Sequence, residues 1–291
     1  MFTIIIPTYN RADFIANTIQ SVLNQTYTNF EIIVVDDGSI DDTEEVVKTI
    51  ADKRIYYYKK ENAERGAARN YGVERANGNY ITFLDSDDLL YPDFFKNAFD
   101  LIQVENHPPF AHLAYEIRDE NGQLLQKFNR IPSNDKLIIV NGNPLSCIGV
   151  LIRKDIATSF KFNEDRQLSG SEDWELWLRI IANHGIVTNH QISACMIQHD
   201  TRSVLIVDEN KLLKRKELAL FYSFQDEKVK EIYTPYFNRM ESFADSYIAL
   251  HLALSVNRKL SFRYLIKSIY LYPQSIFSKR FLAIIKHLII S

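Results

Sequence analysis

Apolar and polar positions divide the first ninety residues into short strands that alternate with amphipathic helices. Continuous apolar runs rich in β-branched residues predict buried strands, and apolar residues three or four apart predict helices with one buried face. The predicted strands are residues 2–6, 31–35, 55–58 and 80–84. The predicted helices are residues 12–24, a helix that Asp42 or Thr43 can cap, and residues 66–76. Such alternation predicts a parallel sheet with helices on both faces.

Beyond residue 92 the regular alternation ends. A helix is predicted for residues 93–105, a hairpin for residues 110–128 around Asn121-Gly122, and strands for residues 147–152 and 192–197. Ser171 is placed to cap a further helix, and the chain after Asp208 is mostly helical. We therefore predict an α/β fold with a mixed, mostly parallel sheet and a C-terminal helical extension. The expected domains are residues 1–205 and 206–291.

The strand at residues 80–84 ends in three carboxylates, Asp85, Asp87 and Asp88. Burying like charges this close together is costly unless a positive charge compensates them. Magnesium and manganese prefer oxygen ligands and are commonly held by one or two carboxylates plus substrate phosphates. A metal site is therefore one interpretation. The alternative is a solvated acidic loop that caps the next helix.

Polar residues also follow the other predicted strands at their carboxyl ends. Thr8-Tyr9 follows the first strand, and Asp36-Asp37 follows the second. Ligands of open α/β sheets bind outside the carboxyl ends of the strands. This shared placement favours a functional role for the carboxylates after residue 84.

Composition is that of an ordinary soluble globular protein, with 46% hydrophobic and 24% charged residues among 291. The two cysteines, Cys147 and Cys195, form no metal-binding or redox pattern, which is typical of a reducing compartment. The first residues lack the basic leader of a secretory signal, and no apolar run is long enough to span a bilayer.

Charge is distributed unevenly along the chain. The net charge is −3, but seven basic and no acidic side chains follow Asp245, which leaves −10 on the preceding residues. Residues 276–290 predict a basic amphipathic helix, with Phe277, Ile284 and Leu288 on its apolar face. We interpret it as a contact with an anionic membrane; the alternative is a helix packed on the catalytic domain or on a partner chain. The chain has no basic stripe, which argues against nucleic acid.

Five short motifs occur in order along the first two-thirds of the chain. They are Ile6-Pro7-Thr8-Tyr9-Asn10, Val35-Asp36-Asp37-Gly38-Ser39, Gly66-Ala67-Ala68-Arg69-Asn70, Leu84-Asp85-Ser86-Asp87-Asp88 and Glu172-Asp173-Trp174. Each motif alone is weak, whereas five in order are specific. Together they resemble the family-2 glycosyltransferases, which have the GT-A fold.

The resemblance implies a role for each matching residue. Asp37 would accept a hydrogen bond from the base, Asp85 would lie at the ribose, and Asp173 would be the general base. Arg69 would approach the pyrophosphate or the base, and Asp87 would bind a divalent metal, with His199 as a further ligand. The nucleotide-binding set it implies is Pro7, Thr8, Tyr9, Asp37, Arg69, Asp85 and Ser86.

Structural alternatives stand beside these roles. Asp37 could cap the turn at Gly38, Arg69 could be a surface helix residue, and His199 could be structural. Asp173 could do no more than stabilise the helix dipole, as an acidic residue in the first turn.

The resemblance implies an inverting glycosyltransferase that uses Mn2+ or Mg2+ and a nucleotide diphosphate sugar, expected to be a UDP-sugar. The expected acceptor is a glycan or a lipid-linked molecule in cell-surface polysaccharide synthesis, at the cytoplasmic face of the membrane. An alternative is a catalytically silent sugar-nucleotide-binding or scaffold subunit of a glycan assembly complex. A nucleotidyltransferase is a third hypothesis. It would need a glycine-rich, phosphate-binding loop after the first strand, and residues 7–12 contain no glycine.

Overall fold

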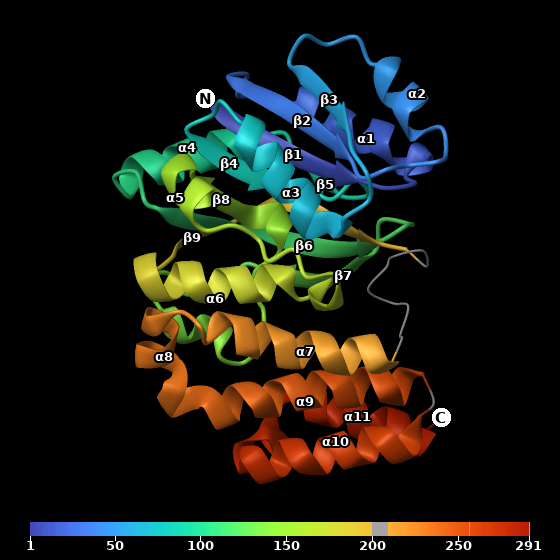
Figure 1. The fold of residues 1–291 in the computed structure, drawn as a ribbon, viewed down its shortest axis with the longest axis vertical. Helices are drawn as coiled ribbons and strands as arrows, with labels where there is room; N and C mark the ends of the chain where they lie inside the picture. Colours follow the sequence, from blue (N-terminus) through green and yellow to red (C-terminus); the bar gives the residue numbers. More distant parts are fainter. Residues whose placement is uncertain (200–208, 256, 291) are drawn as a thin grey trace.

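The computed structural model describes residues 1–199, 209–255 and 257–290. It has a mixed β-sheet at one end and a stack of C-terminal helices at the other, with helix α6 (Glu172–His184) between them (Figure 1). The carboxyl-edge loops of the sheet and the start of α6 are the parts that form the candidate site.

The sheet has the strand order β3-β2-β1-β4-β8-β6-β9-β5, with β7 paired to β6. Its first four strands are mutually parallel, whereas β8 runs antiparallel to both β4 and β6, and β9 is parallel to β6. The strands are β1 (Phe2–Thr8), β2 (Phe30–Asp36), β3 (Ile55–Lys59), β4 (Tyr80–Phe83), β5 (Leu89–Leu90), β6 (Phe110–Asp119), β7 (Leu124–Phe128), β8 (Val150–Arg153) and β9 (Val187–Gln198).

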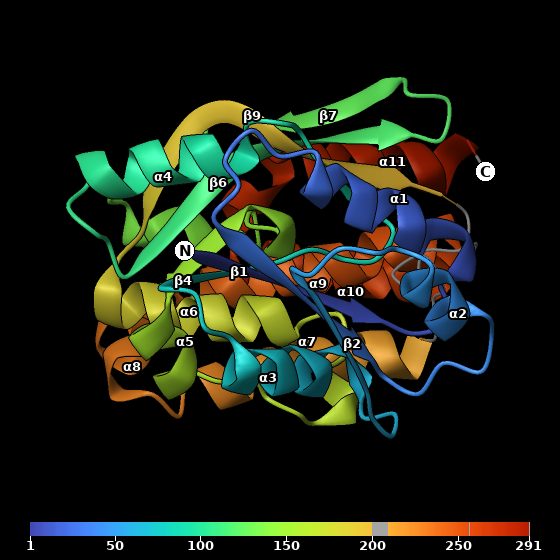
Figure 2. The same ribbon diagram turned by 90° about the horizontal axis from the view of Figure 1, so that it is seen from above.

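Helices cover both faces of this sheet, because successive strand residues point to opposite sides. Ile4 and Ile6 pack with α1 (Ala12–Leu23), α2 (Thr43–Lys48) and α4 (Phe94–Val104), while Ile5 packs with α3 (Glu64–Arg75), α5 (Lys154–Ser159) and α6. Figure 2 shows α1 and α4 on one side of the sheet and α3, α5 and α6 on the other. Gly72 allows the close approach of α3, since a Cβ there would lie 2.6 Å from Ile5 Cγ2.

The C-terminal helices continue the core on the α6 side. Ala219 and Leu220 of α7, Val229 of α8 and Met240 of α9 belong to the same buried cluster as Trp174 and Trp177 of α6. The helices are α7 (Glu209–Ser223), α8 (Glu227–Tyr233), α9 (Phe237–Leu254), α10 (Arg258–Leu271) and α11 (Lys279–Ile290). The predicted boundary between residues 205 and 206 lies outside the described residues, so the two-domain division stays a prediction.

The predicted fold class is confirmed, and each strand and helix predicted before residue 106 is present within two residues of its expected ends. Three local predictions were wrong. Cys147–Gly149 is a turn of 3-10 helix before β8, not part of the strand. Ser171 and Asp42 occupy N-cap positions, but neither side chain makes the expected capping hydrogen bond.

The terminal helix differs from its expected role. Ile284 of α11 is fully buried against Ala249 and Leu265, and Phe281, Ile285 and Leu288 pack around them. The predicted apolar face thus faces the protein, as in the alternative interpretation, except for Phe277, which precedes the helix and is 83% exposed. Arg280, one of the basic residues of this helix, donates to the carbonyl of Phe243.

Candidate active site

The loops after β1 and β2 form one hydrogen-bonded unit at the carboxyl edge of the sheet. The backbone N–H of Asn10 donates to Ser39 Oγ at 2.9 Å, and Asn10 Oδ1 accepts from the N–H of Ile40 at 2.9 Å. Gly38 turns the chain with φ of 88°, where a Cβ would meet Asn62 N at 3.2 Å. These bonds fix the backbone beside Tyr9, whose side chain is 46% exposed and free to contact a ligand.

Asp37 is buried beneath this unit and is bound by both a charge and the backbone. Its Oδ1 accepts from Lys60 Nζ at 2.6 Å and from the N–H of Ala63 at 3.0 Å. Its neighbours Pro7 and Thr8 are also buried at the end of β1. Thr8 Oγ1 is buried without a hydrogen-bond partner among the described residues, so it is a polar atom that a ligand could satisfy.

Arg69 of α3 joins the two halves of the site. Its guanidinium is 2% exposed and donates to Asp85 Oδ1 at 2.8 Å and to Glu172 Oε1 at 2.9 Å. Asp85 follows β4, and Glu172 begins α6, so a single buried cation fixes both elements. Removing one partner of such a buried pair costs about 3–5 kcal/mol.

The carboxylates that follow β4 make different contacts. Asp88 is fully buried, and its Oδ1 accepts from the N–H of Ile197 at 3.0 Å, which ties the loop to the end of β9. Asp87 instead contacts His199, with Oδ2 and Nε2 3.1 Å apart. Ser86, which precedes them, is also buried, and its carbonyl accepts a hydrogen bond from Thr18 Oγ1.

The structure brings Asp87 and His199, the two predicted metal ligands, into contact. A carboxylate and an imidazole are both common ligands of divalent ions, and here Asp87 Oδ2 and His199 Nε2 are in direct contact. The His199 ring is buried and stacks on Phe14, with centroids 4.8 Å apart, which fixes its direction. Arg11 Nε lies 3.5 Å from Asp87 Oδ2 and balances its charge. Within the described parts of the chain, no group of three or more candidate ligands converges, so a metal here would need substrate oxygens.

Asp173, the predicted base, begins α6 next to Glu172. Its Oδ2 accepts from Asn143 Nδ2 at 2.9 Å, and its Oδ1 accepts from the N–H of Trp174 at 2.8 Å. Burial and the negative charge of Glu172 raise the pKa of Asp173 to about 6, against the opposing charges of Arg69 and Lys216. A pKa near 6 is typical of a carboxylate that accepts a proton near neutral pH.

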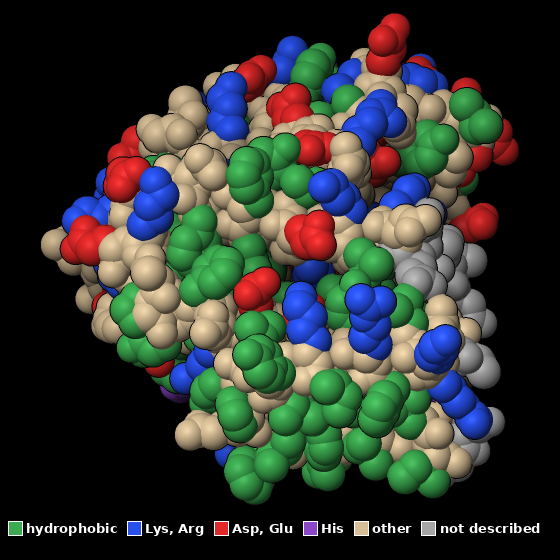
Figure 3. Space-filling view, turned by 60° about the horizontal axis from the view of Figure 1, so that its bottom comes forward, with side chains coloured by type: hydrophobic (Ala, Val, Ile, Leu, Met, Phe, Trp, Pro, Cys, Tyr) green, Lys and Arg blue, Asp and Glu red, His purple; other side chains and the backbone are tan. Residues whose placement is uncertain are grey.

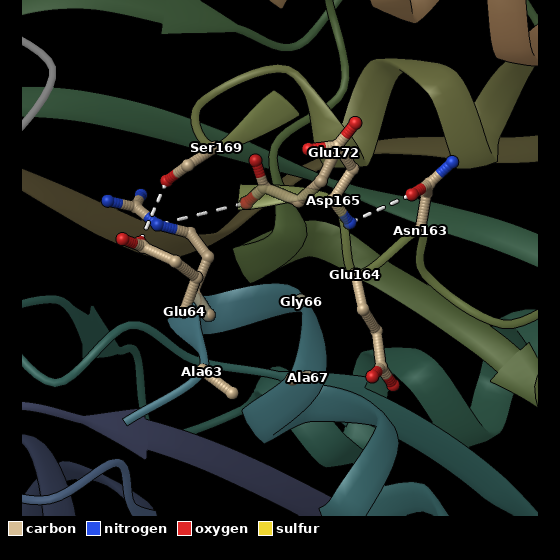
Figure 4. Close-up of a pocket in the computed structure, with 10 residues that line it drawn as sticks. Ala63, Glu64, Gly66, Ala67, Asn163, Glu164, Asp165, Ser169 and Glu172 are labelled. Carbon is tan, nitrogen blue, oxygen red and sulfur yellow. Dashed lines mark hydrogen bonds and ion pairs between the residues drawn. The ribbon is translucent and has the colours of Figure 1, made fainter. Parts of the chain in front are cut away.

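The pKa of Glu172 shifts in the opposite direction. Burial favours its neutral form, but the charges of Arg65 and Arg69 outweigh burial and lower its pKa. The backbone N–H of Gly170 also donates to Glu172 Oε2 at 2.6 Å. Figure 4 shows Glu172 at a small pocket between the start of α3 and the loop that precedes α6, where Ser169 Oγ donates to Glu64. Glu172 therefore stays ionised and holds its charge next to Asp173.

The structure brings the predicted residues into two adjoining groups. The residues from the carboxyl edge of the sheet form one, and Asp173 at the start of α6 belongs to the other, with Arg69 between them. Sequence reasoning missed Arg11, Asn143 and Lys216. Arg11 follows the first motif directly and could have been found there. Asn143 and Lys216 lie in stretches without a motif, and no local signal marks them.

Comparison with known proteins supports the family assignment. The model of the family described as "Glycosyl transferase family 2" matches residues 3–147. An uncharacterized glycosyltransferase of Haemophilus influenzae is 32% identical over 199 residues, which cover 67% of this chain and 78% of that protein.

The chain belongs to glycosyl transferase family 2.

Other relatives match over very different shares of their own length. An uncharacterized glycosyltransferase of Rickettsia bellii is 45% identical over 44% of this chain, but the match spans only 18% of that protein. A putative teichuronic acid biosynthesis glycosyltransferase of Bacillus subtilis is 29% identical over 68% of this chain and 78% of its own length.

Solved structures share the fold of this family member. TarS of S. aureus, residues 1–349 in complex with UDP-GlcNAc, has a TM-score of 0.64 at 18% identity and covers 94% of this chain and 92% of its own. The mannosyltransferase PcManGT of Pyrobaculum calidifontis, in complex with GDP-Man and Mn2+, has a TM-score of 0.61 at 18% identity over 95% and 75% of the two chains. The overlap with TarS includes the C-terminal helices, so the shared fold extends beyond the matched motifs.

We predict that Asp173 titrates near pH 6 and that Glu172→Gln lowers its pKa, because the substitution removes the neighbouring negative charge. NMR of the side-chain carboxyl carbons over pH 4 to 8 measures both values. Glu175→Gln is the matched control, since Glu175 is also a buried glutamate of α6 paired with an arginine, Arg179, at 2.7 Å. An Asp173 pKa below 4.5, or an equal shift in both variants, contradicts this account.

Proposed function

We propose that this protein transfers a sugar from a nucleotide diphosphate sugar, a UDP-sugar, to a hydroxyl of a glycan or lipid-linked acceptor, with inversion at the anomeric carbon. The observation that carries the proposal is the junction of the strand-end carboxylates with Asp173 through Arg69. The names of the relatives, among them a teichuronic acid biosynthesis glycosyltransferase, support a role in cell-surface polysaccharide synthesis.

In this proposal the carboxyl edge of the sheet binds the nucleotide. Tyr9 packs on the base from its exposed position, and the carboxylate of Asp37 accepts a hydrogen bond from the uracil imide. Asp85 binds the ribose hydroxyls and is held in place by Arg69. The backbone ties between the first two loops hold these groups in place before the donor arrives, which reduces the entropic cost of binding.

Asp173 is the proposed general base. It takes the proton of the acceptor hydroxyl as the oxygen attacks the anomeric carbon from the face opposite the leaving nucleotide. Asn143 orients the carboxylate by donating to Oδ2. Because the base must be ionised, the rate of transfer should fall as the pH decreases through about 6.

Asp87 and His199 are the proposed ligands of Mn2+ or Mg2+, with oxygens of the donor diphosphate completing the coordination. Such an ion, when bound, neutralises the charge that develops on the leaving diphosphate. Arg11 lies beside the same carboxylate and can add positive charge.

Asp173→Asn tests the enzymatic proposal. We expect transfer to fall about a hundredfold or more, since the amide cannot accept the proton, while affinity for the UDP-sugar stays near that of the wild type. Donor affinity by calorimetry and transfer rate by product analysis measure the two effects. Full transfer by a variant with a native melting curve would show that another group is the base. Wild-type protein that binds the donor but neither transfers nor hydrolyses it would instead favour the silent binding subunit.

Asp87→Asn tests the metal ligands. We expect donor affinity in Mn2+ to drop to the value measured in EDTA, because a neutral amide is a far weaker ligand. His199→Gln should weaken the same dependence, and Asp100→Asn, on the exposed face of α4, should not. The assignment is wrong if Asp87→Asn retains the full Mn2+ dependence of donor binding.

Part of the proposal is peripheral contact of the C-terminal helices with the cytoplasmic face of an anionic membrane. Figure 3 shows hydrophobic side chains gathered over these helices, with basic side chains beside them. Phe262, Ile266 and Tyr270 of α10 are exposed at a spacing of four, and Arg263 is exposed between them. No described helix is long and apolar enough to cross a bilayer. We therefore assign the membrane contact to this surface of α10, because the apolar face of α11 is buried in the protein.

The double variant Phe262→Ser, Ile266→Ser should lose most of its binding to vesicles that contain an anionic lipid, because it removes apolar area that inserts at the interface. Sedimentation with anionic and with zwitterionic vesicles measures this loss. Val104→Ser, an exposed apolar residue of α4, is the control. Equal vesicle binding by the double variant and the wild type would overturn the membrane contact.

A further inference from the structure

Three basic side chains of the C-terminal helices face the loops on either side of Asp173. A Cβ on Gly170, in the turn before α6, would lie 2.6 Å from Arg215 Nη1. A Cβ on Gly142 would lie 3.8 Å from Arg280 Nη2. Gly142 precedes Asn143, which donates to Asp173. Arg215 of α7 and Arg280 of α11 therefore lie over the two turns that flank the proposed base.

Lys216 adds a third positive charge between these two. Its Nζ lies 4.2 Å from the ring centroid of Tyr247 on α9 and 5.2 Å from that of Trp174, the residue after Asp173. The Tyr247 ring also lies 5.8 Å from the guanidinium carbon of Arg215 and 5.7 Å from that of Arg280. All three cations thus lie within 6 Å of one aromatic ring, that of Tyr247.

These three cations differ from arginines elsewhere in the chain in their partners. Among the described residues none of the three forms an ion pair, unlike Arg69 and Arg179, which pair with glutamates. Arg215 donates to the Tyr247 hydroxyl at 3.3 Å, and Arg280 donates to a carbonyl and to a serine hydroxyl. Arg215 Nε is buried without a hydrogen-bond partner among the described residues. In this part of the chain, the charge of the three side chains is therefore not neutralised by an ion pair.

The titration behaviour of the cluster agrees with this surplus of positive charge. Burial and the charge of Arg215 lower the pKa of Lys216 to about 7, although Asp173 opposes the shift. Burial and the same three cations lower the pKa of His251, which contacts Tyr247, to about 4. Holding like charges together costs free energy that a bound anion would recover.

We propose that Arg215, Lys216 and Arg280 form a binding site for a phosphate group of the acceptor, next to Asp173. Arginine presents a planar fork that matches phosphate oxygens, and lysine adds a mobile point charge. The site rests on the proposed function, because a phosphate held there brings the hydroxyl of the same molecule to the base. The phosphate belongs to a lipid carrier or to a water-soluble glycosyl or polyol phosphate; the chemistry of recognition is shared.

Calorimetric titration of the full chain in EDTA tests the site with two probes, farnesyl phosphate below its micellar concentration and glycerol 3-phosphate. We expect the wild type to bind at least one probe, with affinity that falls as salt rises. Lys216→Met keeps the aliphatic packing and should weaken binding about tenfold, as should Arg280→Gln. Lys214→Met and Lys279→Gln, which change exposed neighbours on the same helices, should have no effect.

Lys216→Arg retains the charge and should retain binding, which separates loss of charge from loss of fold; melting curves check each variant. Binding of farnesyl phosphate alone assigns a lipid carrier, and binding of glycerol 3-phosphate assigns a water-soluble one. The site is overturned if the wild type binds neither probe, or if Lys216→Met and Arg280→Gln bind as tightly as the wild type. Affinity for a UDP-sugar in Mn2+, measured on the same samples, reports on the proposed function separately.

Discussion

The buried guanidinium of Arg69 is the interaction on which the site depends. Asp85 and Glu172 lie 87 positions apart in the sequence, on elements that would repel each other without a cation between them. With Arg69 in place, Glu172 is ionised and fixed, and its charge contributes to the raised pKa of Asp173. The same ion pair therefore positions the proposed donor side of the site and, through Glu172, contributes to the raised pKa of the proposed general base.

The C-terminal helices lie on the Asp173 side of this arrangement. Helices α7, α8 and α9 share the core of α6, so the helix that begins at Glu172 is packed against the sheet on one side and the extension on the other. This packing carries Lys216 and Arg280 to the flank of Asp173. The sheet supplies carboxylates and the extension supplies cations, which gives the site two regions of opposite charge.

Much of the fold was predictable because hydrophobic periodicity is local. The four parallel strands and their helices follow from it, and the strand ends place Asp37, Asp85 and Asp87 at one edge. The order of β5 to β9 depends on long-range pairing that no local pattern encodes. Asn143 and Lys216 reach Asp173 only through tertiary packing. An amphipathic pattern also cannot tell a protein core from a membrane, which is why the buried face of α11 was misread.

The crystal structure of the protein with a UDP-sugar and Mn2+ tests the central claim most directly. The account predicts the uracil base between Tyr9 and Asp37 and the metal ion bound to Asp87 and His199. It also predicts that the anomeric carbon of the sugar faces the Asp173 carboxylate and that Arg69 remains bound to Asp85 and Glu172. A nucleotide bound away from the carboxyl edge of the sheet, or a sugar whose anomeric carbon lies out of reach of an acceptor held at Asp173, would contradict it.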